Sequence, residues 1–541
     1  MKTNTQVGST TGMEGLARAL RFAGAASVAA LLLGGCNVGP KYVKPTAPAP
    51  PEYKESSPAA YNQAAKEANV ASDGAGNAAS GIWRPANPQD AALKGKWWEM
   101  FNEPELNGLE DQLNINNQNI AEYFQNFMAA RAEVREVRSQ FFPTLTTAPS
   151  FARQKTPGTL SHAVATTSST GAVATTSGTT STTMSLPFDV SWEPDLWGKI
   201  RNTVREYQYA AQVSAADLEN ERLTEEADLA EYYFELRGQD ALQDLYNQTV
   251  AADKKSLDLT KALYETGIDN DESVAQAEVT LENAKEASTG IATNRAIYEH
   301  AIATLIGKPA SSFSVPVKPL TTPLPAIPVG VPSQLLERRP DIAGAERTMA
   351  EANALIGVEK AAFYPTLSLT GGGGLESSKI SSLFSAPALF WSLGASASET
   401  IFDAGLRKAT VAQYTAQYHA DEASYRQSVL TAFQQVEDYI ATLRVTSEQI
   451  QQEEIAVASA QRYLNIAMSR YQTGLDPYLN VISAQTTLLN DQQAQVQLRM
   501  SELTAAVQLV QALGGGWDAT QLPAADKVTT DAAVKQVSGT Q

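Results

Sequence analysis

The chain has 541 residues, of which 43% are hydrophobic, and a formal net charge of −18 at pH 7. Its length is sufficient for one large core or several, whereas the negative charge disfavours binding of nucleic acid through phosphate neutralisation. No run of about 18 apolar residues follows the N-terminal segment, so the sequence predicts no transmembrane helix in the mature chain. The acidity suits either a duct that passes cations or a solvated surface on long helices, and composition leaves both interpretations open.

The N-terminal segment is typical of a bacterial lipoprotein signal. Arg18 and Arg21 precede an apolar stretch at 22–33, which small residues and Cys36 follow. This order predicts a secretory signal peptide over 1–35. Cys36 is the only cysteine, so an internal disulfide is excluded. A cysteine directly after the small pair is expected to become a lipidated N-terminus, and stable anchoring there needs more than one acyl chain.

A linker leads from the signal to the first helix. Residues 38–95 are rich in Pro, Ala and Asn, which predicts an extended segment with little structure. The aromatic cluster Trp97–Phe101 is expected to pack in a core rather than to bind a ligand. The first helical stretch is expected at Glu103–Ser139.

Strand patterns begin after Pro143. Apolar and polar residues alternate from Met184 to Trp192, so one face suits lipid and the other suits water. A noisier partner strand is predicted at 145–153. The segment between them, 159–183, is low in complexity and is expected to form an exposed loop.

Long helices are predicted after each strand region. Ile200–Arg237 and Gln239–Thr266 contain almost no helix breakers, and their apolar face is rich in small residues that allow close packing. The helices are expected to reverse at Gly267 and Gly474, because glycine supplies the left-handed residue that ends a helix. Pro477 prevents a simple continuation of the second helix.

The segment 333–370 joins a helix directly to a strand. Pro340 suits the first helical turn, and the residue before Pro365 avoids the helical region, so the helix is expected to stop near Tyr364. After Pro365 the period changes to two, which predicts a strand. Further strands are predicted at 366–375, where four glycines permit curvature or close approach, and at 391–401.

Two arginines stand out in this acidic chain. Arg338 and Arg339 precede the helix that starts at Pro340. Both are expected to pair with Asp341 or Glu346 rather than to bind substrate.

One pattern occurs twice in the chain. Pro143 and Pro365 are 222 positions apart, as are Ile120 and Ile342. Later pairs are 207 positions apart: Gly198 and Gly405, Leu236 and Leu443, Arg237 and Arg444, Gly267 and Gly474, Gly307 and Gly514. The retained register predicts a duplication of about 200 residues, a long unit for a repeat protein.

These segments together resemble a TolC-like outer-membrane efflux factor, in the lipoprotein (OprM/NodT-like) branch of tripartite efflux systems. The resemblance covers nearly all of the mature chain. It rests on LLERRPDIAGAE (335–346), AAFYPTL (361–367), WEPDLWGKIR (192–201), the two YxxG turns and ALGGGW (512–517).

The resemblance implies a mixed fold, with a membrane β-barrel and a long α-helical barrel. Four strands per chain cannot close a barrel, and lipid tolerates no open sheet edge, so the strands are expected to close with those of other chains. The resemblance implies a homotrimer that shares one 12-stranded barrel. The expected divisions are a signal peptide (1–35), a lipidated linker and equatorial segment (36–102), helical-barrel segments (103–142, 195–308, 341–364, 403–513), outer-membrane strands and extracellular loops (143–194, 365–402) and further equatorial segments (309–340, 514–541).

The resemblance also implies where partners bind. The turns, with Gly267, Gly474, Asp269, Asp271 and Asp476, correspond to a periplasmic tip at which a membrane-fusion adaptor docks. The three aspartates would form a charged ring in a trimer or would simply be helix-terminal acids in solvent, and both interpretations stay open.

Some relatives carry gating aspartates at positions that Asn480 and Ser483 occupy here. These two residues are therefore a possible gate of different chemistry. Asn37 is not the aspartate that retains lipoproteins in the inner membrane, so the resemblance implies an outer-membrane lipoprotein that extends into the periplasm.

The sequence offers little chemistry for an enzyme. Its three histidines, His162, His300 and His419, are scattered, and no metal-spaced cluster, nucleophile motif or phosphate-binding loop occurs. No cofactor is expected apart from a covalent lipid on Cys36.

The favoured hypothesis is a passive exit duct of a tripartite efflux pump of the RND type, which conducts drugs or other small molecules. It would bind an adaptor, an inner-membrane pump and outer-membrane lipid, and it would open at its helix tips. The alternatives are a structural coiled-coil lipoprotein, a duct for type I protein secretion and a duct for metal-ion efflux.

Overall fold

The computed structural model describes residues 37–46, 49–50, 53–55, 95–157, 179–327 and 335–538. The predicted signal peptide, Cys36, most of the predicted linker and residues 159–178 of the predicted loop lie outside these residues. The chain divides into two compact units, the first with Met1–Val43, Ala132–Tyr209 and Ala350–Ala420, the second with Lys44–Arg131, Ala210–Met349 and Asp421–Gln541. None of the helices in the described ranges is long and apolar enough to cross a membrane.

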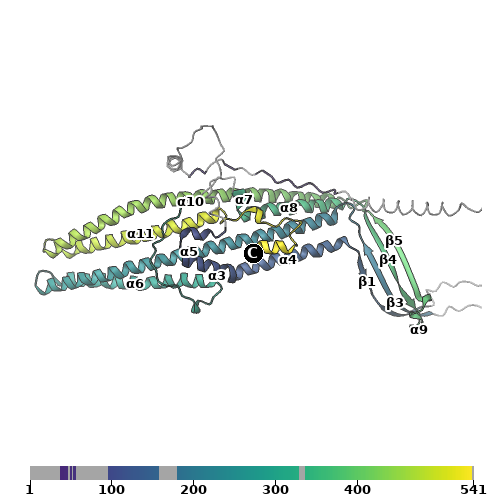
Figure 1. The fold of residues 1–541 in the computed structure, drawn as a ribbon, viewed down its shortest axis with the longest axis horizontal. Coiled ribbons are helices and arrows are strands. Elements are labelled where there is room, and N and C mark those ends of the chain that lie inside the picture. Colours follow the sequence, from purple (N-terminus) through teal and green to yellow (C-terminus); the bar gives the residue numbers. More distant parts are fainter. Residues whose placement is uncertain are drawn as a thin grey trace, which may run out of the picture. The chain divides into compact units, whose positions relative to one another are not determined.

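The order of elements repeats once along the chain (Figure 1). The first copy contains α3 (Pro104–Asn116), α4 (Gln118–Arg138), β1 (Thr144–Thr146), β2 (Ser150–Thr156), β3 (Thr179–Trp192), α5 (Lys199–Glu265) and α6 (Asp271–Leu305). The second contains α7 (Leu335–Arg338), α8 (Pro340–Ala361), β4 (Thr366–Ser377), α9 (Ile380–Leu383), β5 (Leu389–Ser398), α10 (Leu406–Gln472) and α11 (Tyr478–Ala512), and α12 (Asp531–Ser538) follows. The predicted duplication is confirmed.

The strands form one antiparallel sheet in the first unit. β3 pairs with β4 and β4 with β5, while β1 and β2 both pair with β3. β1 and β2 are therefore two parts of one interrupted edge strand. The interruption lies opposite Pro187, which has no N–H to donate, and the Thr147 hydroxyl donates to the Pro187 carbonyl at 2.7 Å instead. Within the described residues the β1/β2 edge and the β5 edge have no pairing partner.

The register separates an apolar face from a polar face. Alternate rows across β3, β4 and β5 carry apolar side chains on one side of the sheet. Two apolar rows are Phe188–Gly373–Trp391 and Val190–Gly371–Leu393, and the polar row between them is Asp189–Gly372–Ser392. Trp391 is 75% exposed, so the apolar face is uncovered in the single chain. The predicted alternation is confirmed.

Two expectations for this sheet need correction or completion. Thr179 to Thr183 were expected in a loop, but they extend β3, because β2 runs to Thr156 and pairs with them. Within the glycine run, close packing requires a glycine at position 374, because Gly374 lies opposite Pro187. A Cβ at Gly374 would overlap the carbonyl oxygen of Leu186.

The predicted helix at Glu103–Ser139 is wrong in its continuity, because the chain breaks at Asn117. Asn117 is extended, with φ −63° and ψ 129°. Its side-chain oxygen accepts a hydrogen bond from the Ile120 amide at 3.0 Å and so caps α4. The opposite error affects α5, which was expected as two stretches but continues through Gly238 for 67 residues. A Cβ at Gly238 would overlap the Met500 side chain, so this glycine allows close packing with α11.

The aromatic cluster packs in the second unit, as predicted. Trp97 is 0% exposed and Phe101 1% exposed. The Trp97 indole N–H donates to Glu226 Oε2 at 3.1 Å. Burial raises the pKa of Glu226 to about 7.

Each copy makes the same backbone contact at the end of its last long helix, α6 in the first copy and α11 in the second, and both contacts lie in the second unit. Gly307 and Gly514 have φ of +68° and +96°. A Cβ at Gly307 would meet the backbone carbonyl of Asn116, and one at Gly514 would overlap the backbone carbonyl of Arg338. Asn116 and Arg338 are themselves 222 positions apart, so the same backbones touch in both copies.

A side chain reinforces this contact in each copy. Asn117 Nδ2 donates to the Leu305 carbonyl at 3.0 Å, and Arg339 Nη1 donates to the Ala512 carbonyl at 3.0 Å. Each acceptor is a last-turn carbonyl that its own helix leaves unpaired. We call the glycine contact and this hydrogen bond together the helix-end lock.

Replacement of Gly514 by alanine should weaken the lock. The added Cβ meets a backbone carbonyl, and alanine disfavours the left-handed conformation by about 1–2 kcal/mol. We expect a lower melting temperature for Gly514→Ala, measured by circular dichroism. Gly290→Ala is the matched control, because no atom lies within 4 Å of a Cβ there and the residue is in a regular helix. An equal effect in both variants would contradict the lock.

Candidate functional site

The two helix reversals of the second unit have the same backbone geometry. Gly267 and Gly474 have φ of +72° and +70°. The Ile268 amide donates to the Leu263 carbonyl at 2.9 Å, and the Leu475 amide donates to the Arg470 carbonyl at 2.9 Å. Both turns are Schellman motifs, which need a left-handed residue after the helix and therefore favour glycine. The predicted positions of both turns are confirmed.

A hydrogen-bond network joins the two turns. The Tyr471 hydroxyl, from the end of α10, donates to Asp269 Oδ2 at 2.6 Å. The other carboxylate oxygen of Asp269 accepts from the Asn270 amide and the Ser273 hydroxyl, each at 2.8 Å. The Tyr471 hydroxyl also lies 3.1 Å from Thr260 Oγ1 of α5. We call this set of contacts the tip clasp.

The electrostatics of the clasp favour an ionised aspartate. Burial alone raises the pKa of Asp269, but the hydrogen bonds from Tyr471, Asn270 and Ser273 outweigh it and lower the pKa below its usual value. Burial and the bond to Asp269 raise the pKa of Tyr471, which therefore remains a proton donor at neutral pH.

An apolar cluster supports the clasp. Tyr471 and Tyr478 are both buried, with ring centroids 5.2 Å apart. The Tyr478 and Ser256 hydroxyls lie 3.2 Å apart, one helical turn from Thr260. The cluster contains Leu257 of α5, Val274, Ala277 and Leu281 of α6, Ala467 of α10, and Val481 and Ala484 of α11. The two helical hairpins therefore share one core beneath their turns.

The second turn holds its aspartate in a different way. Arg470 donates to both carboxylate oxygens of Asp476, at 2.6 and 2.9 Å. This arginine lowers the pKa of Asp476. The contact closes the second turn on itself, whereas Asp269 bonds across to the other hairpin.

The remaining predicted residues have simpler surroundings. Asp271 is exposed in the first turn of α6, where a negative charge suits the helix dipole. Asn480 is half-buried and Ser483 exposed on α11, and neither belongs to the clasp. Cys36 lies outside the described residues. The structure thus brings Asp269 together with Tyr471, a residue that the sequence had marked only as part of a YxxG turn.

Apolar side chains around the turns were not predicted as functional. Ile268 is 63% exposed and Leu475 is 70% exposed. Tyr264 and Leu479 are also exposed beside them. The sequence did contain a signal for them. Ile268 and Leu475 are 207 positions apart and each directly follows a turn glycine, so the repeat retains an apolar residue at this place.

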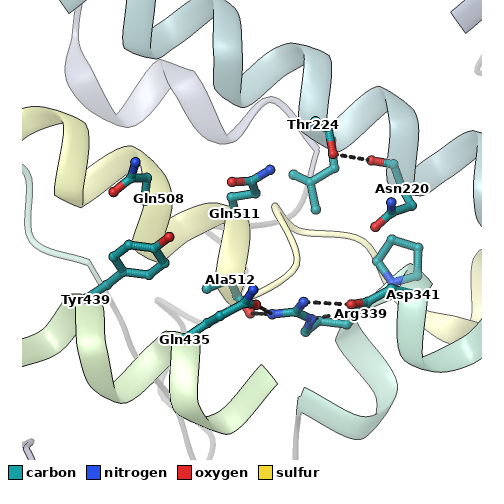
Figure 2. A pocket seen from close by; sticks show the side chains of 11 residues that line it. Asn220, Thr224, Arg339, Asp341, Gln435, Tyr439, Gln508, Gln511 and Ala512 are labelled. Atoms are coloured by element: carbon teal, nitrogen blue, oxygen red, sulfur yellow. Dashed lines mark hydrogen bonds and ion pairs between the residues drawn. The ribbon is translucent and has the colours of Figure 1, made fainter. Parts of the chain in front are cut away.

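A cavity of about 190 Å³ lies elsewhere in the second unit (Figure 2). Amide side chains such as Gln508 and Gln511 line it, together with Tyr439 and Arg339. The Arg339 guanidinium contacts Asp341 at 2.7 and 3.0 Å, which confirms one of the predicted pairs. Because this ion pair neutralises the charge, Arg339 has a structural role in the helix-end lock.

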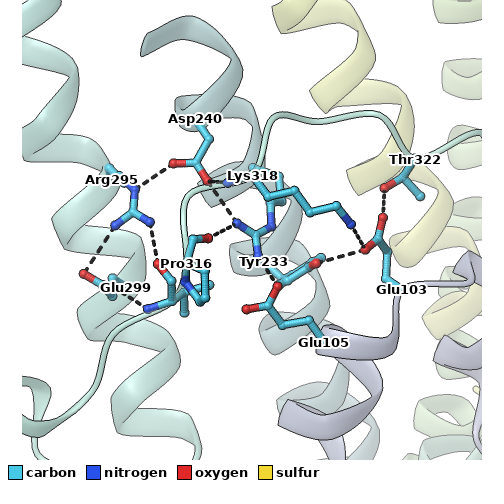
Figure 3. A network of polar contacts seen from close by, with 11 residues as sticks. Glu103, Glu105, Tyr233, Asp240, Arg295, Glu299, Pro316, Lys318 and Thr322 are labelled. Atoms are coloured by element: carbon cyan, nitrogen blue, oxygen red, sulfur yellow. Dashed lines mark hydrogen bonds and ion pairs between the residues drawn. The ribbon is translucent and has the colours of Figure 1, made fainter. Parts of the chain in front are cut away.

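A network of ion pairs fastens the segment between the copies to the first copy (Figure 3). Arg237 is 2% exposed at its side chain and pairs with Asp240 at 3.0 Å and with Glu105. It also donates to the Pro316 carbonyl at 2.6 Å. Lys318 pairs with Glu103 of the α3 start at 2.7 Å.

The equivalent arginine of the second copy fastens the N-terminal linker in the same unit. Arg444 pairs with Glu55 at 2.7 Å, and the Glu55 amide donates to Glu437 at 2.9 Å. Both arginines thus hold a connecting segment, although Arg444 is 45% exposed at its side chain.

No group of three or more His, Cys, Asp or Glu side chains in the described ranges is arranged to hold a metal ion. The clasp contains the carboxylate of Asp269, the phenol of Tyr471 and the hydroxyls of Ser273 and Thr260. These groups can fasten and release two hairpins, because each contact is a hydrogen bond that a small displacement breaks.

Comparison with known proteins yields consistent matches over both copies. A family model described as outer membrane efflux protein matches residues 109–308 and 331–515. The chain is 30% identical over 494 residues to the toluene efflux pump outer membrane protein TtgC of Pseudomonas putida, covering 91% of this chain and 95% of the relative. It is 30% identical over 507 residues to the solvent efflux pump outer membrane protein SrpC of Pseudomonas putida, covering 93% and 100%. The solved outer-membrane channel OprN aligns with a TM-score of 0.76 and 27% identity, over 89% of this chain and 100% of that one.

Replacement of Tyr471 by phenylalanine should loosen the two turns. The ring keeps its place in the apolar cluster, while the bond to the Asp269 carboxylate is lost at a cost of about 1–2 kcal/mol. We expect a wider distribution of distances between spin labels on the two turns. Tyr463→Phe, on an exposed tyrosine two turns earlier in α10, is the control. Identical distributions in both variants would show that the clasp does not hold the hairpins.

The buried Asp253 on α5 predicts a pH dependence. It is 4% exposed, and no basic side chain among the described residues pairs with it. Burial raises its pKa to about 6. Ionisation of Asp253 therefore lowers the free energy of unfolding as the pH rises from the ordinary pKa of an aspartate through 6. Below that ordinary pKa the carboxyl is protonated in both states, and the loss is absent. We expect the free energy of unfolding of Asp253→Asn at pH 7.5 to exceed that of the parent by about 1–2 kcal/mol after allowance for solvent screening. The variant should therefore melt at a higher temperature.

This gain should vanish near pH 4, where the parent carboxyl is protonated as well. Thermal melting across pH 4–8 checks the sign. The exposed Asp258→Asn, on the same helix, serves as the control and should show no such trend. A gain that stays constant across this range would rule out ionisation of Asp253 as its cause.

Proposed function

Because this chain belongs to the outer membrane efflux protein family, we propose that it acts as a homotrimeric exit duct that opens at the turns of its helical hairpins. The family membership itself places the chain in the outer membrane as a component of an efflux pump and not as an enzyme. A purely structural coiled-coil role does not fit that family.

The observation that carries the proposal is the open sheet. Its edge strands, β1/β2 and β5, have unpaired backbone groups within the described residues, and one face exposes Phe188, Trp391 and Leu393. In hydrocarbon each unpaired group costs several kcal/mol, so the edges need strands of other chains. Three copies with four strand positions each supply a closed barrel of twelve strands, with the apolar face toward lipid.

The tip clasp supplies the second part of the proposal. An adaptor that binds the exposed apolar side chains beside Gly267 and Gly474 would gain burial of Ile268 and Leu475. If this binding favours separated hairpins, it opens the duct by shifting an equilibrium between two states. Energy would come from an inner-membrane pump, of the RND type by resemblance.

The conducted molecules are proposed from the relatives and from the resemblance. TtgC and SrpC are named for toluene and solvent efflux. Small apolar compounds and drugs are therefore the substrate class that we propose. Type I protein secretion and metal-ion export receive no support from a feature of the described residues.

A lipid anchor on Cys36 completes the proposal. The cysteine follows a signal-like segment and precedes Asn37, the first described residue. An anchor of several acyl chains would hold the duct in the outer membrane in addition to its strands.

Native mass and single-channel conductance of the detergent-purified protein test the duct. We expect a trimer with small currents and rare openings, because the clasps are closed. Tyr471→Phe should raise the open fraction by about fivefold to thirtyfold, the factor that corresponds to 1–2 kcal/mol. Tyr463→Phe should behave like the parent. A stable monomer without conductance would refute the trimeric duct, and a trimer whose open fraction ignores Tyr471→Phe would refute the clasp as its gate.

A further inference from the structure

The first described residues of the chain bind to the first unit where α5 begins. The Asn37 side-chain oxygen accepts a hydrogen bond from Asn202 Nδ2 at 2.9 Å and one from the Gly39 amide at 3.2 Å. The Val38 amide donates to the Trp197 carbonyl at 3.3 Å. Asn202 is only 3% exposed, so the Asn37 side chain reaches a buried partner.

The next residues continue along the same unit. Asn353 of α8 donates from Nδ2 to the Pro40 carbonyl at 3.2 Å. The Tyr42 ring lies 6.4 Å from the Tyr209 ring of α5. Residues 37–42, which we call the N-terminal strap, therefore contact one helix from each copy of the repeat.

Three glycines make room for this strap. Gly198 has φ +82°, and a Cβ there would lie 2.9 Å from Asn37 Oδ1. A Cβ at Gly357 would lie 2.6 Å from Asn202 Nδ2 and 3.1 Å from the Gly39 Cα. A Cβ at Gly39 would lie 2.9 Å from both Asn202 Nδ2 and the Gly357 Cα. Glycines from three separate segments thus meet around two asparagines, and any side chain at these positions would displace the strap.

We infer that Gly198, Asn202 and Gly357 form a docking site for the residue that follows the lipidated cysteine, with Asn37 as the positioning residue. This inference rests on the proposed anchor at Cys36. Adjacent Cα atoms are about 3.8 Å apart, so the docked Asn37 holds the acyl attachment point against the protein. The anchor is then a fixed part of the first unit and not the end of a free tether.

The position of the site suits acyl chains that enter lipid. β3 ends at Trp192, and the strap is bonded to the Trp197 carbonyl five residues later. Five residues span at most about 18 Å. Asn37 therefore lies near the strand ends of the same unit, and acyl chains on the preceding residue would be within reach of the interface that flanks the hydrocarbon layer.

Hydrogen exchange of the full-length lipoprotein tests the docking site. Residues 37–46 are followed by mass spectrometry in the parent, in Asn202→Ala and in Thr203→Ala. We expect Asn202→Ala to speed exchange of the Val38 and Gly39 amides at least tenfold, because the partner of Asn37 is lost. Thr203 is the matched control, since its hydroxyl donates to the Lys199 carbonyl of its own helix and, among the described residues, to no residue of the strap. Thr203→Ala should leave the strap protected.

A second variant guards against local unfolding of α5. Gly357→Ala should release the strap by crowding Asn202, although alanine is the better helix former. Protection that persists in both Asn202→Ala and Gly357→Ala, or a strap that exchanges freely in the parent, would overturn the inference.

The mass of the N-terminal peptide shows whether Cys36 is acylated, so failure of the proposed anchor can be told apart from failure of the docking site. An unmodified Cys36 with a protected strap would refute the anchor and leave a docking site for the strap alone. An acylated Cys36 with a freely exchanging strap would refute the docking site only. Cys36→Ser should keep the strap protected, because the contacts that hold the strap among the described residues come from residues 37–42.

Discussion

Both copies of the repeat depend on one close contact between two backbones. In each, the glycine that ends the second long helix lies against the carbonyl that ends the short helix, Gly307 against Asn116 and Gly514 against Arg338. No other residue type combines the left-handed conformation with so short an approach. The contact places the start of the next helix, because the residue after each carbonyl, Asn117 or Arg339, also bonds the last turn of the long helix. The hairpins that carry the tip clasp therefore start from the same geometry in both copies.

Sequence patterns predicted a large part of this fold for physical reasons. The turn glycines, the helix-to-strand change after Pro365 and the alternation of β3 follow from local backbone preferences and periodicity. The break at Asn117 could not be predicted in this way, because the side chain is held by partners from other helices, such as the Leu305 carbonyl. The interruption between β1 and β2 required the register, which places Pro187 opposite the gap.

The candidate site was predicted in position but not in chemistry. The five tip residues lie at or beside the two turns, as expected, yet only Asp269 bonds to the other hairpin. Its partner Tyr471 occurs at the position equivalent to Tyr264, which is exposed. The duplicated sequence made these tyrosines look alike, and their difference arises because Tyr471 and Tyr478 face the shared core while Tyr264 faces outward. Packing between copies thus decides which of two similar residues bonds to the other hairpin, and a single sequence does not contain that information.

The helix-end lock has a consequence for how the polypeptide can be divided. Each lock is made entirely within one copy, whereas the contacts between copies include the β3–β4 pairing, the packing of Gly238 against Met500 and the shared core beneath the turns. A chain cleaved between Ile327 and Leu335 would leave both locks intact, because neither lock contains a residue from between these two positions. We expect the two halves to associate as complementary fragments. The chain can therefore be regarded as a heterodimer whose two subunits are joined end to end and differ at their interface.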